Sequence, residues 1–449
     1  MGAAMNTGFA LAHSFWLARH NLRRLHGAAL AHYQDRRAQS IVGFARRHSP
    51  FYAALYGAAP TTSWRTLPTI DKAVMMANFT TLNTRQVKLE AALATALAAE
   101  SSHDFRARVG ELTVGLSSGT SGHRGLFLVD ELEQARWAGT VVARVAPRIR
   151  RHGVRITLFS MSGSNLYQRL QRGWLRFQHF NLATPIDEAV ARLNAQPPDL
   201  LAGPPSYLHA LSERQLAGDL RLRPERLISV AEVLEPHIEK QLGERFACAV
   251  HQIYQCTEGL IGVSCKAGRL HLQEDLVAVQ TEPLEPAAQS QRVTPIITDL
   301  WRQVQPIIRY RLNDILTLSA AESCSCGSGF RTIERIEGRL DDVCRFRARD
   351  GSLRPVFPAT IRRMVLLASG AVRDYEVIQE RDSQLRVRLA LACGAAFETV
   401  APLVRNALEA GLREQGIAGA DLVIEPGEPQ RFTTRKLRRV RRAPSEETI

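Results

Sequence analysis

The sequence has few cysteines and no long apolar run, and both absences restrict what the chain can be. Seven cysteines occur among 449 residues. An odd number of thiols in a long chain argues against a disulfide framework and favours a reducing, cytoplasmic location. No uninterrupted apolar stretch reaches the length of a transmembrane helix, so we expect no stable membrane insertion.

The first twenty residues lack the clean apolar core and small-residue cleavage site of a signal peptide. His13, Arg19 and His20 interrupt the apolar positions there. The pattern is typical of an amphipathic helix, which would suit contact with a membrane, contact with a partner, or packing on its own domain. We expect the last of these.

The charge balance is strongly basic, with a formal net charge of +14 and a pI near 10.0. Such a charge favours an anionic partner, although an arginine-rich solvated surface would also account for it. The chain lacks nucleic-acid module signatures and a stripe of lysines interleaved with aromatics. We therefore expect no nucleic-acid partner, and a polyphosphate ligand becomes the more attractive reading.

Length and composition indicate a globular protein of two or more domains. Hydrophobic residues make up 45% of the chain and charged residues 23%, which is ordinary for a packed core. The first part, to about residue 105, has mainly helical periodicity, clearest over Leu22–Tyr56. We find no internal repeat and no low-complexity tract.

After Gly110 the pattern changes to apolar strand-like runs that alternate with helical stretches. This alternation predicts an α/β fold with mostly parallel sheets. The expected strands are Leu112–Leu116, Val154–Phe159, Leu200–Ala202, Leu227–Val230 and Ala249–Tyr254, and the expected helices are Leu132–Ala146, Pro205–Ala217 and Pro236–Phe246. A loop rich in Pro, Glu, Gln and Ala is expected over Glu282–Arg292.

A smaller α+β unit is expected to follow. Its predicted elements are strands at Tyr375–Ile378, Leu385–Leu389 and Leu422–Ile424 and a helix at Phe397–Gln415. The sequence thus predicts a large N-terminal domain over residues 1–338 and a small C-terminal domain over residues 339–449.

A segment rich in serine and glycine, residues 116–125 (LSSGTSGHRG), follows one of the predicted strands. Glycines let successive backbone N–H groups converge on an anion, hydroxyls add donors, and an arginine adds charge. The spacing does not match the common P-loop, and a flexible turn is the alternative. The candidate phosphate-binding residues are Ser117, Ser118, Gly119, Thr120, Ser121, Gly122 and Arg124.

This segment resembles the phosphate loop of the acyl-adenylate-forming superfamily. Further motifs of that superfamily recur in the expected order over residues 49–436, nearly the whole chain. Within it the chain is most similar to the phenylacetate-CoA ligase branch and to the synthetase that adenylates the deazaflavin cofactor of methanogens. The resemblance implies a large adenylate-forming domain and a small, mobile C-terminal lid.

The run Tyr254–Glu258 (YQCTE) resembles the family's Y-G-x-T-E. The resemblance implies that Tyr254 lies by adenine, that Thr257 contacts phosphate and that Glu258 holds Mg²⁺, which prefers oxygen ligands. Gln255 replaces the glycine, which puts the backbone approach to the nucleotide in doubt. Glu232, after Ala231, falls in the segment that borders adenine.

Thr298-Asp299 and the run 309–314 (RYRLND) resemble T-D-L followed by R-Y-R-T-G-D, with Leu312 and Asn313 as departures. The resemblance implies that Asp314 accepts hydrogen bonds from the ribose hydroxyls. A turn or capping role is the alternative reading of an aspartate at a strand end.

Residues 338–342 (GRLDD) resemble the family's hinge, and Thr434–Leu437 (TRKL) resembles the terminal motif that carries the adenylation lysine. By resemblance, Arg339 contacts nucleotide, Asp341 absorbs the backbone rotation, and Lys436 bridges the acyl carboxylate and the α-phosphate. Arg435 replaces the usual glycine. Without the resemblance, these would be a polar linker and one more basic residue near the C-terminus.

Four residues have the types and spacing of a zinc site. Cys265 and His271 flank an expected turn, and Cys324 and Cys326 lie about fifty residues further on. Two ligand pairs on tight turns can close a tetrahedral site, and thiolate with imidazole suits Zn²⁺. Some members of the resembled branch carry ligands in matching positions, which implies a structural role.

Together, the motifs and the resemblance imply an enzyme that activates a carboxylic acid with ATP and Mg²⁺ to acyl-AMP. The enzyme would then pass the acyl group to CoA or a carrier-protein thiol. One alternative is nucleotidyl transfer that leaves a stable AMP adduct of a cofactor. Another is a non-catalytic nucleotide-binding or partner-binding relative, which the motif departures motivate. The resemblance places the acid near Phe159–Tyr167, Phe180, Pro204–Tyr207 and Ala231, and dimers in the resembled branch make a homodimer an expectation to test.

Overall fold

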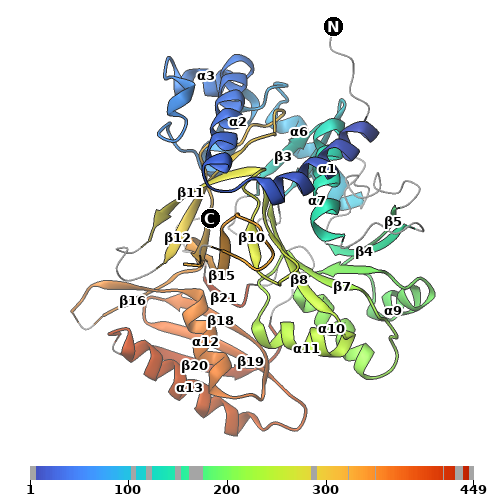
Figure 1. Cartoon of the computed structure of the whole chain (residues 1–449). Coiled ribbons are helices and arrows are strands. Elements are labelled where there is room, and N and C mark those ends of the chain that lie inside the picture. Colours follow the sequence, from blue (N-terminus) through green and yellow to red (C-terminus); the bar gives the residue numbers. More distant parts are fainter. Residues whose placement is uncertain are drawn as a thin grey trace. The chain divides into compact units, whose positions relative to one another are not determined.

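The computed structural model describes most of the chain. The described residues are 7–102, 108–117, 124–146, 153–160, 175–284, 291–321, 323–348, 350–417, 419–429 and 438–443. No helix in these ranges combines the length and apolar character needed to cross a bilayer. The described chain forms two compact units (Figure 1). Unit 1 is residues 1–312 and 318–334, and unit 2 is residues 313–317 and 335–449.

Unit 1 begins with helices. The stretch with helical periodicity, Leu22–Tyr56, is divided between several helices, with breaks near a glycine and a proline. The first helix ends at Arg24, and the second begins at Gly27, whose φ of +49° is readily adopted only by glycine. Pro50 starts the third helix, and the Ser49 hydroxyl caps it by accepting the Tyr52 N–H at 3.3 Å. These helices are α1 (Thr7–Arg24), α2 (Gly27–His48), α3 (Pro50–Tyr56), the short η1 (Thr61–Ser63), α4 (Lys72–Ala77), α5 (Phe79–Leu82) and α6 (Leu89–Ser102).

A small antiparallel sheet and one long helix follow. The sheet has the order β1-β2-β3, with β1 (Arg108–Val109), β2 (Leu112–Leu116) and β3 (Leu126–Val129), so β3 lies at one edge. Helix α7 (Glu131–Val145) begins at Asp130, whose carboxylate accepts the Glu133 N–H at 2.8 Å. The β2 strand and α7 agree with the prediction.

A parallel sheet is the centre of unit 1, which confirms the predicted α/β class. Its parallel strands have the order β8-β7-β6-β4-β5. The strands are β4 (Val154–Ser160), β5 (Leu175–Asn181), β6 (Leu200–Gly203), β7 (Arg226–Val230) and β8 (Ala249–Cys256), and the connecting helices are α9 (Ile186–Ala195), α10 (Pro205–Leu216) and α11 (Pro236–Phe246).

Helices cover both faces of this parallel sheet, and alternating side chains explain why. Leu200 and Ala202 pack in the core beneath α1 and α7, whereas Leu201 between them packs in the core with α9, α10 and α11. Such continuous apolar strands are typical of parallel sheets buried on two sides. Figure 1 shows α7 and α1 on one side of β4–β8 and α9–α11 on the other.

The sheet continues with antiparallel strands that the sequence reading did not include. Strand β9 (Gly259–Ser264) pairs with β8, β10 (Leu270–Leu272) pairs with β9, and the start of β15 (Thr332–Arg339) pairs with β10. Strand β11 (Val277–Pro283) pairs with β12 (Arg292–Asp299), which also pairs with β13 (Tyr310–Arg311). Part of the predicted loop after residue 284 lies outside the described residues.

Helix α1 is fixed to the body of unit 1 by close packing and by a hydrogen bond from a buried ion pair. A Cβ on Gly139 of α7 would meet the Leu11 carbonyl oxygen at 2.2 Å, so only glycine permits this approach. Arg144 of α7 and Asp275 have side chains only 3% and 1% exposed and pair at 2.8 Å. The Arg144 guanidinium also donates to the Ala18 carbonyl of α1. The expectation that the N-terminal helix packs on its own domain is therefore confirmed.

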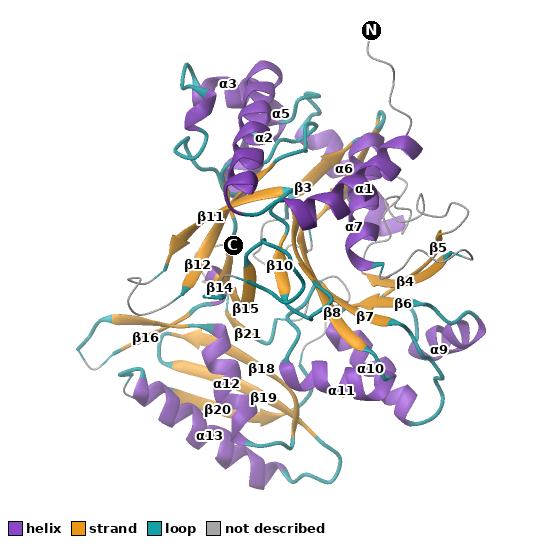
Figure 2. Cartoon of the chain, viewed as in Figure 1, coloured by secondary structure: helices purple, strands orange, loops and turns teal. Residues whose placement is uncertain are grey.

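The main sheet of unit 2 has four strands. Helices cover one of its faces (Figure 2). The sheet order is β20-β19-β18-β21. Tyr375 and Val377 of β18 point into the core, whereas Asp374 and Glu376 pair with arginines on the other face. The elements are β14 (Asp314–Leu318), which crosses the unit boundary as β15 does, η2 (Leu340–Asp342), β16 (Cys344–Arg347), β17 (Leu353–Val356), α12 (Pro358–Ala368), β18 (Val372–Arg381), β19 (Gln384–Leu391), α13 (Phe397–Glu414), β20 (Asp421–Pro426) and β21 (Val440–Arg442).

Candidate active site and candidate metal centre

The serine- and glycine-rich segment is described at its two ends. Ser118, Gly119, Thr120, Ser121 and Gly122 lie outside the described residues. The Ser117 N–H donates to the Gly125 carbonyl at 2.7 Å, and the Gly125 N–H donates to the Ser117 hydroxyl at 2.7 Å. The Lys72 ammonium lies 3.4 Å from the same hydroxyl. The ends of the segment are thus held together between β2 and β3, with a cation beside them.

Arg124, the predicted phosphate contact, pairs with Glu100 from α6. Its two terminal nitrogens donate to the two carboxylate oxygens at 2.6 and 2.8 Å. This bidentate pair lowers the pKa of Glu100 and raises that of Arg124. The guanidinium also donates to the Ser117 carbonyl at 3.2 Å. If Arg124 contacts phosphate, Glu100 neutralises part of its positive charge.

Thr257 and Glu258 lie in the turn between β8 and β9, and their side chains are already hydrogen-bonded. The Thr257 hydroxyl donates to one Glu258 carboxylate oxygen at 2.8 Å, and the Tyr310 hydroxyl donates to the other at 2.8 Å. Glu258 is 7% exposed and Tyr310 is 3% exposed. Burial and the neighbouring carboxylate raise the pKa of Tyr310, so the phenol remains a donor. Oxygen ligands of this kind suit a hard cation.

Arg302, which the sequence analysis did not identify, hydrogen-bonds to the backbone of this turn. Its guanidinium donates to the Thr257 carbonyl at 2.7 Å and to the Leu128 carbonyl of β3 at 3.3 Å. The side chain comes from the connection after β12, between the T-D and R-Y-R motifs. A basic residue between two motifs was the only signal in the sequence, and it did not identify the partner.

Glu232 and Tyr254 lie near the carboxyl ends of β7 and β8. In parallel sheets, ligands commonly bind at these strand ends. The Glu232 carboxylate accepts the Ser206 hydroxyl at 3.0 Å and the Ser206 N–H at 3.3 Å, at the start of α10. Tyr254 is half-buried opposite Gly262 in β9, where a register shift follows at Gln255. The replaced glycine of the Y-G-x-T-E pattern thus coincides with this irregularity.

The candidate residues of unit 2 form a compact cluster around η2. Arg339 lies 3.6 Å from the Asp314 carboxylate. The Asn313 side chain donates to Asp341, and the Asn313 carbonyl accepts the Leu340 N–H at 2.9 Å. Asn313, one of the departures from the family pattern, therefore ties the two motifs together. The predicted catalytic Lys436 lies outside the described residues.

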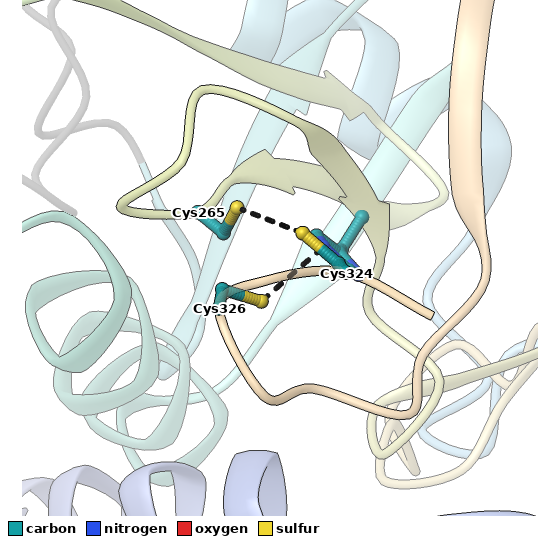
Figure 3. Close-up of side chains that lie close together, drawn as sticks. Cys265, Cys324 and Cys326 are labelled. Atoms are coloured by element: carbon teal, nitrogen blue, oxygen red, sulfur yellow. Dashed lines mark hydrogen bonds between the residues drawn. The ribbon is translucent and has the colours of Figure 1, made fainter. Parts of the chain in front are cut away.

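The four predicted metal ligands come together in unit 1. Their ligand atoms all lie within 4.8 Å of one another. The Cys265 and Cys324 sulfurs are 3.8 Å apart, and the Cys326 sulfur is 3.5 Å from His271 Nε2 (Figure 3). Tetrahedral zinc, with Zn–S of about 2.3 Å and Zn–N of about 2.0 Å, separates two sulfurs by about 3.8 Å and sulfur from nitrogen by about 3.5 Å. The donor set and its spacing fit Zn²⁺.

Neighbouring backbone groups orient these ligands. His271 Nδ1 lies 2.7 Å from the Phe330 carbonyl, which directs Nε2 toward the cysteines. The Ala267 N–H donates to the Cys265 sulfur at 3.3 Å, and the Ser328 N–H donates to the Cys326 sulfur at 3.4 Å. These N–H bonds fix the positions of the two sulfurs, and zinc binds cysteine as the thiolate.

Two of the expected acid-pocket residues are core residues instead of open pocket walls. Phe159 is fully buried, Phe180 is 1% exposed, and their rings stack at 4.7 Å. Tyr207 stacks on Phe159 at 4.5 Å and stays half-buried, with its hydroxyl donating to the Thr184 carbonyl at 3.2 Å. Residues 161–167 of the expected pocket lie outside the described residues.

No protein-family model and no curated protein matches the sequence. The fold does match solved structures over almost the whole chain. A structure of 2-hydroxyisobutyryl-CoA ligase with 2-HIB-AMP superposes with a TM-score of 0.70 at 17% identity, covering 95% of this chain and 92% of that chain. The anthranilate CoA ligase AuaEII with anthranoyl-AMP gives 0.51 at 13% identity, covering 73% and 66%.

A third match is the amide bond synthetase McbA from Marinactinospora thermotolerans, with a TM-score of 0.50 at 15% identity, covering 73% of this chain and 67% of that one. The chain therefore has the two-domain fold of adenylate-forming ligases, with acyl- and aryl-CoA ligases among its structural neighbours.

Proposed function

We propose that the chain is an adenylate-forming ligase, which joins AMP from ATP to a carboxylic acid with release of pyrophosphate and then passes the acyl group to a thiol with release of AMP. The observation that carries the proposal is an ordered set of superfamily motifs in a chain whose fold covers 92% of a CoA ligase. Within the superfamily we assign it to the phenylacetate-CoA ligase-like branch. The acceptor is CoA or the pantetheine arm of a carrier protein.

In this proposal, Thr257 and Glu258 hold the phosphates of the nucleotide in place. The turn between β8 and β9 offers one hydroxyl and one buried carboxylate, both fixed by hydrogen bonds. Glu258 would hold Mg²⁺, which supplies positive charge to the phosphates. Preorganised groups cost no rearrangement when charge develops in the transition state.

Lys436 is proposed as the cation that neutralises charge on the acyl carboxylate and the α-phosphate during adenylation. Ser117 to Gly122 would bind phosphate, and Asp314, Arg339 and Asp341 would contact or control the nucleotide from unit 2. Tyr254 and Glu232 would border adenine, near the carboxyl ends of parallel strands.

Acid-dependent exchange of pyrophosphate into ATP tests the proposal directly, across a panel of aromatic and aliphatic acids. Lys436→Ala should lower exchange by about 10²–10³. Lys240→Ala, which changes a lysine side chain 77% exposed on α11, is the matched control and should leave exchange unchanged. No exchange with any acid, or equal exchange in Lys436→Ala and wild type, would reject this assignment.

Product analysis then separates thioester formation from nucleotidyl transfer. With CoA present, mass spectrometry should detect an acyl-CoA and free AMP. A final product that retains AMP would instead support the transfer reaction to a cofactor.

We also propose that Cys265, His271, Cys324 and Cys326 hold a structural Zn²⁺. The observation that supports this is a four-ligand cluster whose spacing suits tetrahedral zinc. The ion would fasten the turn after β9 to the turn before β15, which stabilises unit 1. Purified protein should contain about one zinc per chain, and metal analysis that finds only trace zinc would contradict this.

A further inference from the structure

The segment after β12 is held by two buried carboxylates. The Asp299 carboxylate accepts the N–H groups of Trp301 and Arg302 at 2.8 and 2.9 Å. The Glu133 carboxylate accepts the N–H groups of Gln303 and Val304 at 2.6 and 2.9 Å. Four successive backbone N–H groups are therefore satisfied, and the segment has a defined conformation from which side chains can act.

Two side chains of this segment reach β3. The Gln305 amide oxygen accepts the Leu128 N–H at 2.9 Å, and its nitrogen donates to the Leu126 carbonyl at 3.2 Å. The amide thus pairs with the free edge of the small sheet as a neighbouring strand would. Arg302 adds a bond to the Leu128 carbonyl and another to Gln305, both at 3.3 Å.

The shortest bond of the Arg302 guanidinium is to the other side, the Thr257 carbonyl at 2.7 Å. Arg302 is 8% exposed, so these bonds form away from water, where a charged donor gives strong hydrogen bonds. Strand β3 begins one residue after Gly125, at the end of the serine- and glycine-rich segment. One side chain therefore links β3 to the turn that carries Thr257 and Glu258.

We infer that Arg302, supported by Gln305, is a positioning residue that sets the distance between β3, which follows the serine- and glycine-rich segment, and the Thr257–Glu258 turn. This inference rests on the proposed function, because it assigns both segments to one bound Mg·ATP. A residue of this kind touches neither nucleotide nor acid. It acts by fixing the Thr257 carbonyl, and through it the hydroxyl and carboxylate that face the phosphates.

Arg302→Met tests the inference, since methionine fills part of the space and donates no hydrogen bond. We expect the KM for Mg·ATP in pyrophosphate exchange to rise roughly 10–100-fold, as for other groups that orient ligands. The KM for the acid should change little. Arg302→Lys, which keeps a charged donor, should recover part of the loss.

The matched control is Arg46→Met, because Arg46 also donates to a loop carbonyl, that of Ala59, at 2.7 Å but far along the chain from either motif. A similar melting temperature for the two variants, with only Arg302→Met impaired in Mg·ATP use, supports positioning. A KM for Mg·ATP that stays at the wild-type value in Arg302→Met would overturn the inference. An increase of the same size in Arg46→Met would overturn it as well.

Hydrogen–deuterium exchange gives a second readout that does not depend on activity. Arg302→Met should raise amide exchange over residues 255–260 and 126–129, and Arg46→Met should not. If wild type shows no pyrophosphate exchange, the proposed function fails, while unchanged amide exchange at both segments would refute the positioning role by itself.

Discussion

Strand β9 joins two clusters that differ in how completely the protein satisfies them. Glu258 immediately precedes the strand, and its carboxylate accepts two hydroxyl hydrogen bonds. Cys265 immediately follows the strand, and its sulfur faces the Cys324 sulfur at 3.8 Å. The first cluster is held in shape by protein donors alone, whereas the second gathers thiols that repel one another once they ionise.

The difference indicates what each cluster needs. In our proposal the Glu258 turn binds a ligand that comes and goes, and Tyr310 and Arg302 support its geometry in the meantime. In our proposal the cysteine cluster holds a permanent cation, because thiolates at this spacing would repel one another without a metal. The predictions below test this contrast.

Removal of two sulfur ligands should have the largest effect. The double variant Cys324→Ser/Cys326→Ser is expected to lose zinc and about 4 kcal/mol of unfolding free energy, which is the stabilisation from an ion present at about 1,000 times its Kd. Metal analysis and urea unfolding measure both. Cys393→Ser, which changes an exposed cysteine, should alter neither the zinc content nor the unfolding free energy. A double variant as stable as wild type would show that the cysteine cluster does not depend on a metal.

Protonation of Glu133 should have the next largest effect. Burial raises the pKa of this carboxyl from 4.5 to about 7, so the unfolded chain releases the proton at lower pH than the folded chain. The stability that the protonated group contributes is fully present below about pH 4.5 and is lost as the pH rises to about 7.

Glu133→Gln cannot lose a proton, so its melting temperature relative to wild type should rise between pH 5 and pH 8. Thermal unfolding at several pH values measures this difference. The exposed carboxylate of Glu244 provides the control variant Glu244→Gln. Parallel plots of melting temperature against pH for wild type and Glu133→Gln would show that Glu133 does not titrate in this range.

Loss of one hydroxyl at the turn should have the smallest effect. Tyr310→Phe removes one donor to Glu258 and should cost about 1 kcal/mol of stability, with a higher Mg²⁺ requirement in pyrophosphate exchange. Tyr52→Phe is the matched control, because the Tyr52 hydroxyl is also buried and donates to a carbonyl, that of Pro306, at 2.9 Å. An equal Mg²⁺ requirement in both variants would show that Tyr310 does not support binding of the cation.

Periodicity predicted the elements whose burial follows a simple rule. Leu200–Ala202 is apolar at every position because helices cover both faces of the sheet, and the structure places it in β6. The helix prediction over Leu22–Tyr56 had the right type but missed the breaks at Gly27 and Pro50. Short antiparallel strands such as β10, with three residues, are too brief to show a period.

The candidate sites divide in the same way. Cysteines and a histidine on predicted turns suggested a ligand set, and the family resemblance supported it, so the four ligands could be named from the sequence. Arg302 and Tyr310 could not be assigned, because their partners are 45 and 52 residues away in the chain. No local pattern in the sequence encodes which carbonyl or carboxylate a distant donor reaches.

The N-terminal helices depend on parts of the chain that are synthesised much later. Asn21 bonds to Asp275, Tyr52 to Pro306 and Thr84 to Val304. During translation these residues emerge more than two hundred residues before the partners just named. The apolar face of α1 stays uncovered until α7 (Glu131–Val145) has also emerged. Such long-range closure slows folding and prolongs exposure to aggregation. A ribosome-bound fragment that ends near Gly110 should therefore be a substrate for chaperones and not an independent domain.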